Sequence, residues 1–121
     1  MKACVLAAPG PVEKGPLALR DVPDPVPGDA DLLIRVRACG VCRTDLHVVE
    51  GELPVRRPGV IPGHQVVGEV VARGPGVRCF AAGDRVGVAW LHRTCGRCRF
   101  CAGGRENLCE APQFTGWSVD G

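Results

Sequence analysis

The sequence has 121 residues with 17 Gly, 11 Pro and 8 Cys, and its 15 basic and 13 acidic side chains leave a net charge of +2. This balanced charge, without a block of one sign, argues against a nucleic acid or a membrane surface as partner. No apolar run approaches the roughly eighteen residues that a membrane-spanning helix needs. Abundant Gly and Pro without a repeating period favour a single domain of short strands joined by turns.

We expect strands over residues 2–7, 17–22, 31–39, 66–72 and 85–90, separated by turns rich in Gly and Pro. Together they predict a mainly β domain, barrel-like or sandwich-like.

Two segments are especially informative. Strand 31–39 is the clearest because Ile34, Val36 and Ala38 alternate with polar neighbours, as a half-buried strand requires. Residues 42–49 lack Gly and Pro and place apolar side chains at helical spacing, which predicts a short helix.

The cysteine content indicates either a disulfide framework or a metal site. The first residues carry one Lys and a six-residue apolar run that Pro9 interrupts, too little for a signal peptide. We therefore expect a cytoplasmic protein with reduced thiols and bound metal. We expect three further cysteines in the core, because free Cys is among the most buried residue types: Cys4, Cys39 and Cys79.

Four cysteines follow the pattern C-x2-C-x2-C-x7-C in a segment without strand or helix period: Cys95, Cys98, Cys101 and Cys109. Four thiolates at about 2.3 Å satisfy tetrahedral Zn²⁺ and leave no open position, so the site would be structural. Iron–sulfur proteins share the first two spacings, but there the fourth Cys typically follows after three residues and precedes Pro, whereas here it follows after seven and precedes Glu110. Four unrelated surface cysteines are the third interpretation. Surrounding arginines are expected to offset the thiolate charge: Arg93, Arg97, Arg99 and Arg105.

A second cluster combines residues 40–47 with Pro62-Gly63-His64. The Cys42 thiolate and the His64 imidazole are too few to complete a zinc shell, so a metal there keeps open positions, as a catalytic metal needs. Asp45 could accept the spare imidazole N–H of that histidine. Thr44 and His47 could pass a proton onward near neutral pH.

These motifs resemble those of the zinc-dependent alcohol dehydrogenases of the medium-chain dehydrogenase/reductase superfamily. The matching segments cover essentially the whole chain in order: GVCRTDLH, the PGH step, GDRVGV, WLHRTCGRCRFC and GRENLC. The resemblance implies one GroES-like domain over residues 1–121, a partly open β-barrel with short helices and a zinc-binding lobe at about residues 91–112. It also implies that an intact enzyme oxidises a primary or secondary alcohol to an aldehyde or ketone by hydride transfer to NAD or NADP.

The resemblance also assigns roles to residues. Cys42 and His64 would ligate the catalytic zinc with support from Asp45, and the four-cysteine pattern would hold the structural zinc. Thr44 and His47 would form a proton relay through the cofactor ribose, and Arg43 would meet the cofactor pyrophosphate. The substrate pocket would include Trp90 and Leu53.

The chain departs from the family at two points. Gln65 stands where the family commonly has Glu, and a neutral amide cannot act as an anionic metal ligand. No nucleotide-binding Rossmann domain is visible, since Gly74-Pro75-Gly76 lacks the third Gly and the following helix. We therefore expect a truncated chain, inactive alone, whose intact enzyme includes that domain and forms a homo-oligomer. The alternatives are a zinc-binding structural or interaction module and an iron–sulfur electron carrier.

Overall fold

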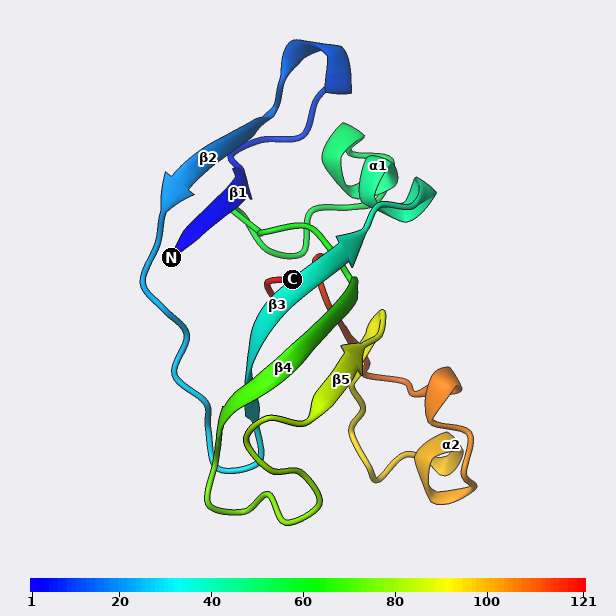
Figure 1. Cartoon of the computed structure of the whole chain (residues 1–121). Coiled ribbons are helices and arrows are strands. Elements are labelled where there is room, and N and C mark those ends of the chain that lie inside the picture. Colours follow the sequence, from blue (N-terminus) through cyan, green and yellow to red (C-terminus); the bar gives the residue numbers. More distant parts are fainter.

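The computed structural model describes residues 1–121, and strands dominate it (Figure 1). The strands are β1 (Lys2–Leu6), β2 (Leu17–Asp21), β3 (Leu32–Gly40), β4 (Gln65–Arg73), β5 (Arg85–Val88), β6 (Leu91–Arg93) and β7 (Gln113–Phe114). The helices are α1 (Arg43–Glu50) and α2 (Arg99–Ala102), with 3-10 turns η1 (Val12–Lys14) and η2 (Glu106–Leu108). None of the helices has the length and apolar character needed to cross a bilayer.

The predicted mainly β fold class is confirmed. Each of the five expected strands and the expected helix is present, with ends within two residues of the prediction. The strands pair antiparallel in three separate sheets, β1-β2, β3-β4-β5 and β6-β7, so the barrel is open rather than closed by continuous hydrogen bonding.

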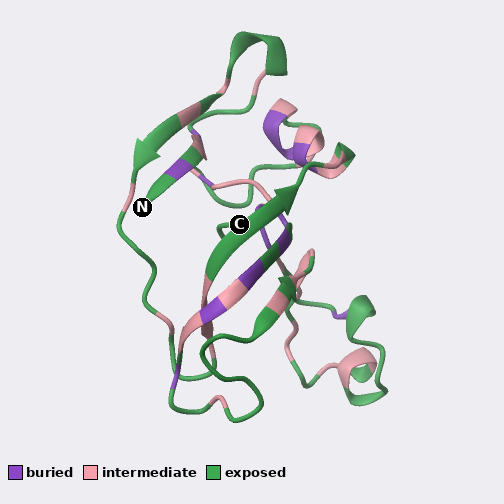
Figure 2. Cartoon of the chain, in the orientation of Figure 1, coloured by how far each residue is buried: buried purple, intermediate pink, exposed green.

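Strand β4 is the centre of the largest sheet, and one of its faces is covered. Val66, Gly68 and Val70 are buried while Val67 is 46% exposed (Figure 2). Gly68 is required here because a Cβ at this position would lie 2.6 Å from the carbonyl oxygen of Arg35 on β3. The alternation matches a strand with one face toward the core.

The expected alternation along β3 is wrong in its second half. Val36 is 56% exposed and Ala38 is exposed as well. The pairing with β4 shifts register between Leu33 and Ile34 and again between Val36 and Ala38. Such bulges change which face a side chain occupies, so a period of two cannot continue through them.

A small hydrophobic core packs β1 and α1 against the segment that precedes β4. Leu6 of β1, Val48 and Val49 of α1, and Val60 form one buried cluster. Backbone hydrogen bonds reinforce it, since Leu6 N–H donates to the Val60 carbonyl at 2.9 Å. The cluster therefore fixes α1 relative to the segment that leads into β4.

The three cysteines expected in the core are exposed, and that prediction is wrong. Cys4 pairs with Leu19, itself 68% exposed, on the uncovered face of the β1-β2 ribbon. Cys39 lies on the exposed half of β3, and Cys79 lies between β4 and β5. Their position in strand-like segments suggested that these cysteines are buried. They are exposed because the small sheets leave many of their faces open to solvent.

Candidate metal centres

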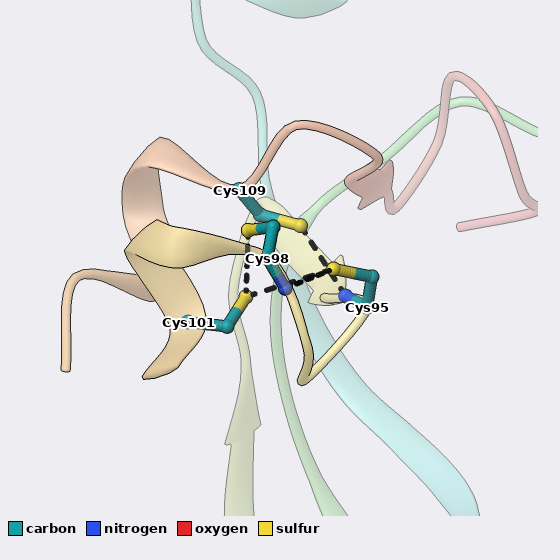
Figure 3. Close-up of side chains that lie close together, drawn as sticks. All are labelled: Cys95, Cys98, Cys101 and Cys109. Atoms are coloured by element: carbon teal, nitrogen blue, oxygen red, sulfur yellow. Dashed lines mark hydrogen bonds between the residues drawn. The ribbon is translucent and has the colours of Figure 1, made fainter. Parts of the chain in front are cut away.

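The four cysteines of the predicted structural site converge beside α2, in a lobe that projects from the sheets (Figures 1 and 3). All four sulfur atoms lie within 4.8 Å of one another. Cys101 Sγ is 3.9 Å from Cys95 Sγ and 3.5 Å from Cys98 Sγ. Tetrahedral bonds of about 2.3 Å to one Zn²⁺ would separate the sulfurs by about 3.8 Å. The donors and their spacing therefore fit zinc.

Backbone N–H groups donate hydrogen bonds to these sulfurs and thereby stabilise their thiolate forms. The Cys95 N–H donates to Cys109 Sγ at 3.2 Å, and the Cys98 N–H donates to Cys95 Sγ at 3.4 Å. Hydrogen bonds from the backbone N–H groups of Cys101 and Glu110 lower the pKa of Cys98 to about 6. Burial, and then its contact with Cys98, raises the pKa of Cys101 to about 11. Cys101 therefore stays a thiol near neutral pH without a cation, and a bound Zn²⁺ would favour its thiolate form.

Two of the arginines near the four cysteines form ion pairs with carboxylates. Arg93 pairs with Asp31 at 2.9 Å, and Arg99 pairs with Glu110 at 3.3 Å. Backbone N–H groups, in contrast, donate directly to the sulfurs of Cys95 and Cys109.

The second cluster is also assembled as the sequence predicts. Cys42 Sγ lies 3.2 Å from His64 Nε2, and Asp45 Oδ1 lies 3.2 Å from Nδ1 of the same histidine. His64 and Asp45 are 6% and 9% exposed. One thiolate, one imidazole and a carboxylate that orients the imidazole form a donor set that fits zinc with open coordination positions.

Local structure explains this placement. Cys42 is the N-cap of α1, and its N–H donates to Asp45 Oδ2 at 2.8 Å, which ties the carboxylate to the first turn. His64 directly precedes β4 and follows Gly63, whose φ of 117° requires glycine. The same carboxylate therefore fixes both the start of the helix and the imidazole.

Aromatic rings form a wall beside this site. Trp90 meets His64 edge to face, with ring centroids 4.8 Å apart, and stacks on Phe114 at 5.0 Å. Trp117 continues the stack. Neither Phe114 nor Trp117 could be predicted here, because no sequence period marks them.

The two residues assigned to the substrate pocket lie in different surroundings. Leu53 packs against the core cluster and lines an apolar cavity of about 130 Å³, to which Val48 and Trp117 also contribute. Trp90 does not line this cavity and instead contacts the His64 ring.

The residues expected at the cofactor lie on α1. Arg43 and Thr44 open the helix, and His47 follows one turn later, with a side chain that is 33% exposed. No hydrogen bond joins Thr44 to His47; the His47 Nδ1 contacts the Glu52 carboxylate instead. Sequence reasoning missed Glu52, whose only signal was its position just beyond a helix-ending glycine.

Gln65, the first residue of β4, directly follows His64 of the second metal centre. It is exposed and lies over Gly40, with its Oε1 2.8 Å from where a Cβ at that position would be. It makes no hydrogen bond to Cys42 or His64, so its amide does not belong to their donor set.

Comparison with known families agrees with this geometry. The family model described as "Alcohol dehydrogenase GroES-like domain" matches residues 28–121. The chain belongs to this family. Its GroES-like domain therefore carries both the four-cysteine cluster and the cluster of Cys42, Asp45 and His64.

Individual relatives give the same family. The chain is 52% identical to "Probable alcohol dehydrogenase AdhA" of Mycobacterium tuberculosis, over 100% of this chain and 36% of that protein. It superposes with a TM-score of 0.89 at 35% identity on a cobalt- and zinc-bound thermostable alcohol dehydrogenase from Pyrobaculum aerophilum, covering 100% of this chain and 36% of the other. A structure of an NAD-dependent alcohol dehydrogenase gives a TM-score of 0.89 at 36% identity, covering 100% of this chain and 35% of the other. The chain thus spans about a third of the length of these proteins.

Proposed function

We propose that this GroES-like chain supplies the catalytic domain of a zinc-dependent alcohol dehydrogenase. The observation that carries the proposal is the set of half-buried Cys42 with buried His64 and Asp45. A structural or interaction module needs the four-cysteine lobe alone, whereas a second, incomplete donor set has a use only where the metal must bind a further ligand.

Each site residue has a role in this proposal. Cys42 and His64 hold a zinc ion, with Asp45 orienting the imidazole, and the structural zinc is held by Cys95, Cys98, Cys101 and Cys109. When bound, the zinc supplies a Lewis acid that lowers the pKa of an alcohol, and the nicotinamide cofactor accepts the hydride. The protein supplies the geometry that holds both.

The proton of the alcohol leaves along α1. Thr44 lies in the first turn of the helix, two residues after Cys42, and His47 lies one turn further, where its partly exposed ring can release a proton to solvent. Trp90 forms an apolar wall next to His64, and Leu53 lines the neighbouring cavity, which suits primary or secondary alcohols larger than the smallest ones.

The partners follow from the same family assignment. Arg43, 69% exposed at the start of α1, offers its charge to the phosphates of NAD or NADP. The proposal includes a nucleotide-binding domain that completes the site in the intact enzyme, a cytoplasmic location and a homo-oligomer. Neither nucleic acid nor membrane is a partner in it.

Metal analysis of the complete protein tests the proposal. We expect one zinc at each of the two clusters, and Cys42→Ala should remove one while leaving the other bound. Cys4→Ala is the matched control, because Cys4 is exposed and belongs to neither cluster. Alcohol-dependent reduction of NAD or NADP should disappear with Cys42→Ala and persist with Cys4→Ala. Unchanged metal content in Cys42→Ala would disprove the catalytic site, although the structural site would stand.

A further inference from the structure

The Glu52 carboxylate contacts or lies close to two exposed basic side chains of α1, His47 and Arg43. Its Oε2 contacts His47 Nδ1, and its Oε1 lies 3.8 Å from Arg43 Nη2. The three side chains are between 33% and 69% exposed, so they face the solvent side of the helix rather than the core.

The backbone, rather than a flexible side chain alone, brings the carboxylate there. Helix α1 ends at Gly51, whose φ of 82° reverses the chain direction. The Leu53 N–H then donates to the His47 carbonyl at 3.2 Å, so residue 52 is held beside the last turn. A side chain at position 51 would meet Pro9, with its Cβ 2.9 Å from the proline Cβ, which keeps this turn closely packed.

This contact determines which nitrogen of His47 carries hydrogen. An ionised carboxylate only accepts hydrogen bonds, so Nδ1 must be the donor. Nε2 of the neutral ring then keeps its lone pair and is the atom that can take up a proton. Without such an acceptor, the neutral imidazole of histidine favours the other tautomer, in which Nε2 carries the hydrogen and cannot act as a base.

We propose that Glu52 is a positioning residue that holds His47 in the Nδ1–H tautomer, so that Nε2 accepts the proton that leaves the alcohol. The catalytic part of this inference rests on the proposed function, whereas the tautomer does not. The proton taken up on Nε2 then passes to solvent, and the Glu52 carboxylate accepts the Nδ1–H hydrogen bond. The other carboxylate oxygen of Glu52, Oε1, lies 3.8 Å from Arg43 Nη2 and holds this guanidinium close to His47.

Nitrogen NMR on the complete protein with ¹⁵N-labelled histidine tests the tautomer directly. The His47 signals are assigned by their loss in His47→Gln. In the wild type, we expect the neutral His47 ring to carry its hydrogen on Nδ1. Glu52→Gln retains an acceptor oxygen and should preserve this tautomer. Glu52→Ala should shift the majority of the neutral rings to the Nε2–H tautomer. An Nε2–H majority in the wild type, or an unchanged tautomer in Glu52→Ala, would overturn the proposal.

Steady-state kinetics on the same variants test the consequence. General acid–base catalysis typically accelerates a reaction about 10²–10⁴-fold. A His47 ring in the wrong tautomer should lose part of this effect, so Glu52→Ala should lower kcat by about tenfold and leave the KM for the alcohol unchanged. Glu52→Gln should lose less, and Glu50→Gln is the matched control because Glu50 faces the Val12 N–H instead. An equal loss in Glu50→Gln, or no loss in Glu52→Ala when His47→Gln is impaired, would refute the role of Glu52. If the wild type oxidises no alcohol, the proposed function fails while the NMR result still decides the tautomer.

Discussion

The indole rings of Trp90 and Trp117 lie nearly parallel, at 11°, with their centroids 5.9 Å apart. This stack connects the second metal centre to the small core. Trp90 contacts His64 edge to face, while Trp117 packs against the core cluster and donates its Nε1–H to the Pro54 carbonyl at 2.9 Å. The His64 imidazole and the core are therefore coupled through aromatic packing.

Truncating Trp90 should destabilise the domain. Trp90→Ala removes the stacking on two aromatic rings and the edge contact with His64, and should lower the free energy of unfolding by about 3 kcal/mol. Trp90→Phe, which keeps an aromatic ring, should lose clearly less. Urea denaturation followed by circular dichroism measures both, and equal losses in the two variants would argue against the role of stacking.

Removing the Asp45 carboxylate should weaken the second metal centre selectively. Asp45→Ala leaves the Cys42 N–H and His64 Nδ1 without their acceptor, and losing such a supporting group typically reduces metal affinity about 10- to 100-fold. Competition with a chromogenic chelator should show one weakened zinc and one unchanged zinc. Asp21→Ala is the control, because Asp21 is exposed and pairs only with Lys2. Weakening of both zinc ions would mean that Asp45 acts through overall stability.

Thiol reactivity should distinguish the cysteines of the four-cysteine lobe once zinc is removed. With a pKa of about 6, Cys98 is largely thiolate at pH 7, whereas Cys101, with a pKa of about 11, remains a thiol. Brief treatment of the chelated protein with iodoacetamide at pH 7 should therefore label Cys98 before Cys101, as mass spectrometry can show. At pH 5, below the pKa of Cys98, the thiolate fraction of Cys98 falls about tenfold, so its labelling should slow by that factor while it still precedes that of Cys101. Equal labelling at pH 7 would contradict the assigned order.

The loop that carries His64 should depend on a close contact between two glycines. Gly116 has a φ of 74°, and a Cβ there would lie 2.6 Å from the Gly63 carbonyl oxygen. Gly116→Ala should therefore lower the unfolding free energy by about 3 kcal/mol, more than left-handed backbone strain of about 1–2 kcal/mol explains. Gly15→Ala is matched in backbone, with φ of 64° and nothing within 4 Å, and should show the strain alone. Thermal unfolding compares the two, and similar losses would rule out the contact.

Much of the candidate site could be predicted from local sequence. The spacing of Cys95, Cys98 and Cys101 brings their sulfurs within reach of one ion because short peptide segments have limited reach. Cys42 and Asp45 are likewise placed by a single helix turn, since Asp45 caps the N–H of Cys42.

Other features could not be predicted because they depend on which faces are covered. Val36 and Cys39 read as parts of a half-buried strand, but bulges in β3 and the open side of the sheet leave them exposed. The contact of Glu52 with His47 depends on the left-handed turn at Gly51.

By itself, the sequence determined the residue types and the local geometry of both metal centres, and with them the family. Only the tertiary structure decided that His64, 22 residues from Cys42, meets that thiolate, that Trp90 and Trp117 stack, and which cysteines are exposed. The physical reason is that ligand spacing within a turn is fixed by covalent geometry, whereas burial and long-range contacts arise from the packing of segments far apart in the chain.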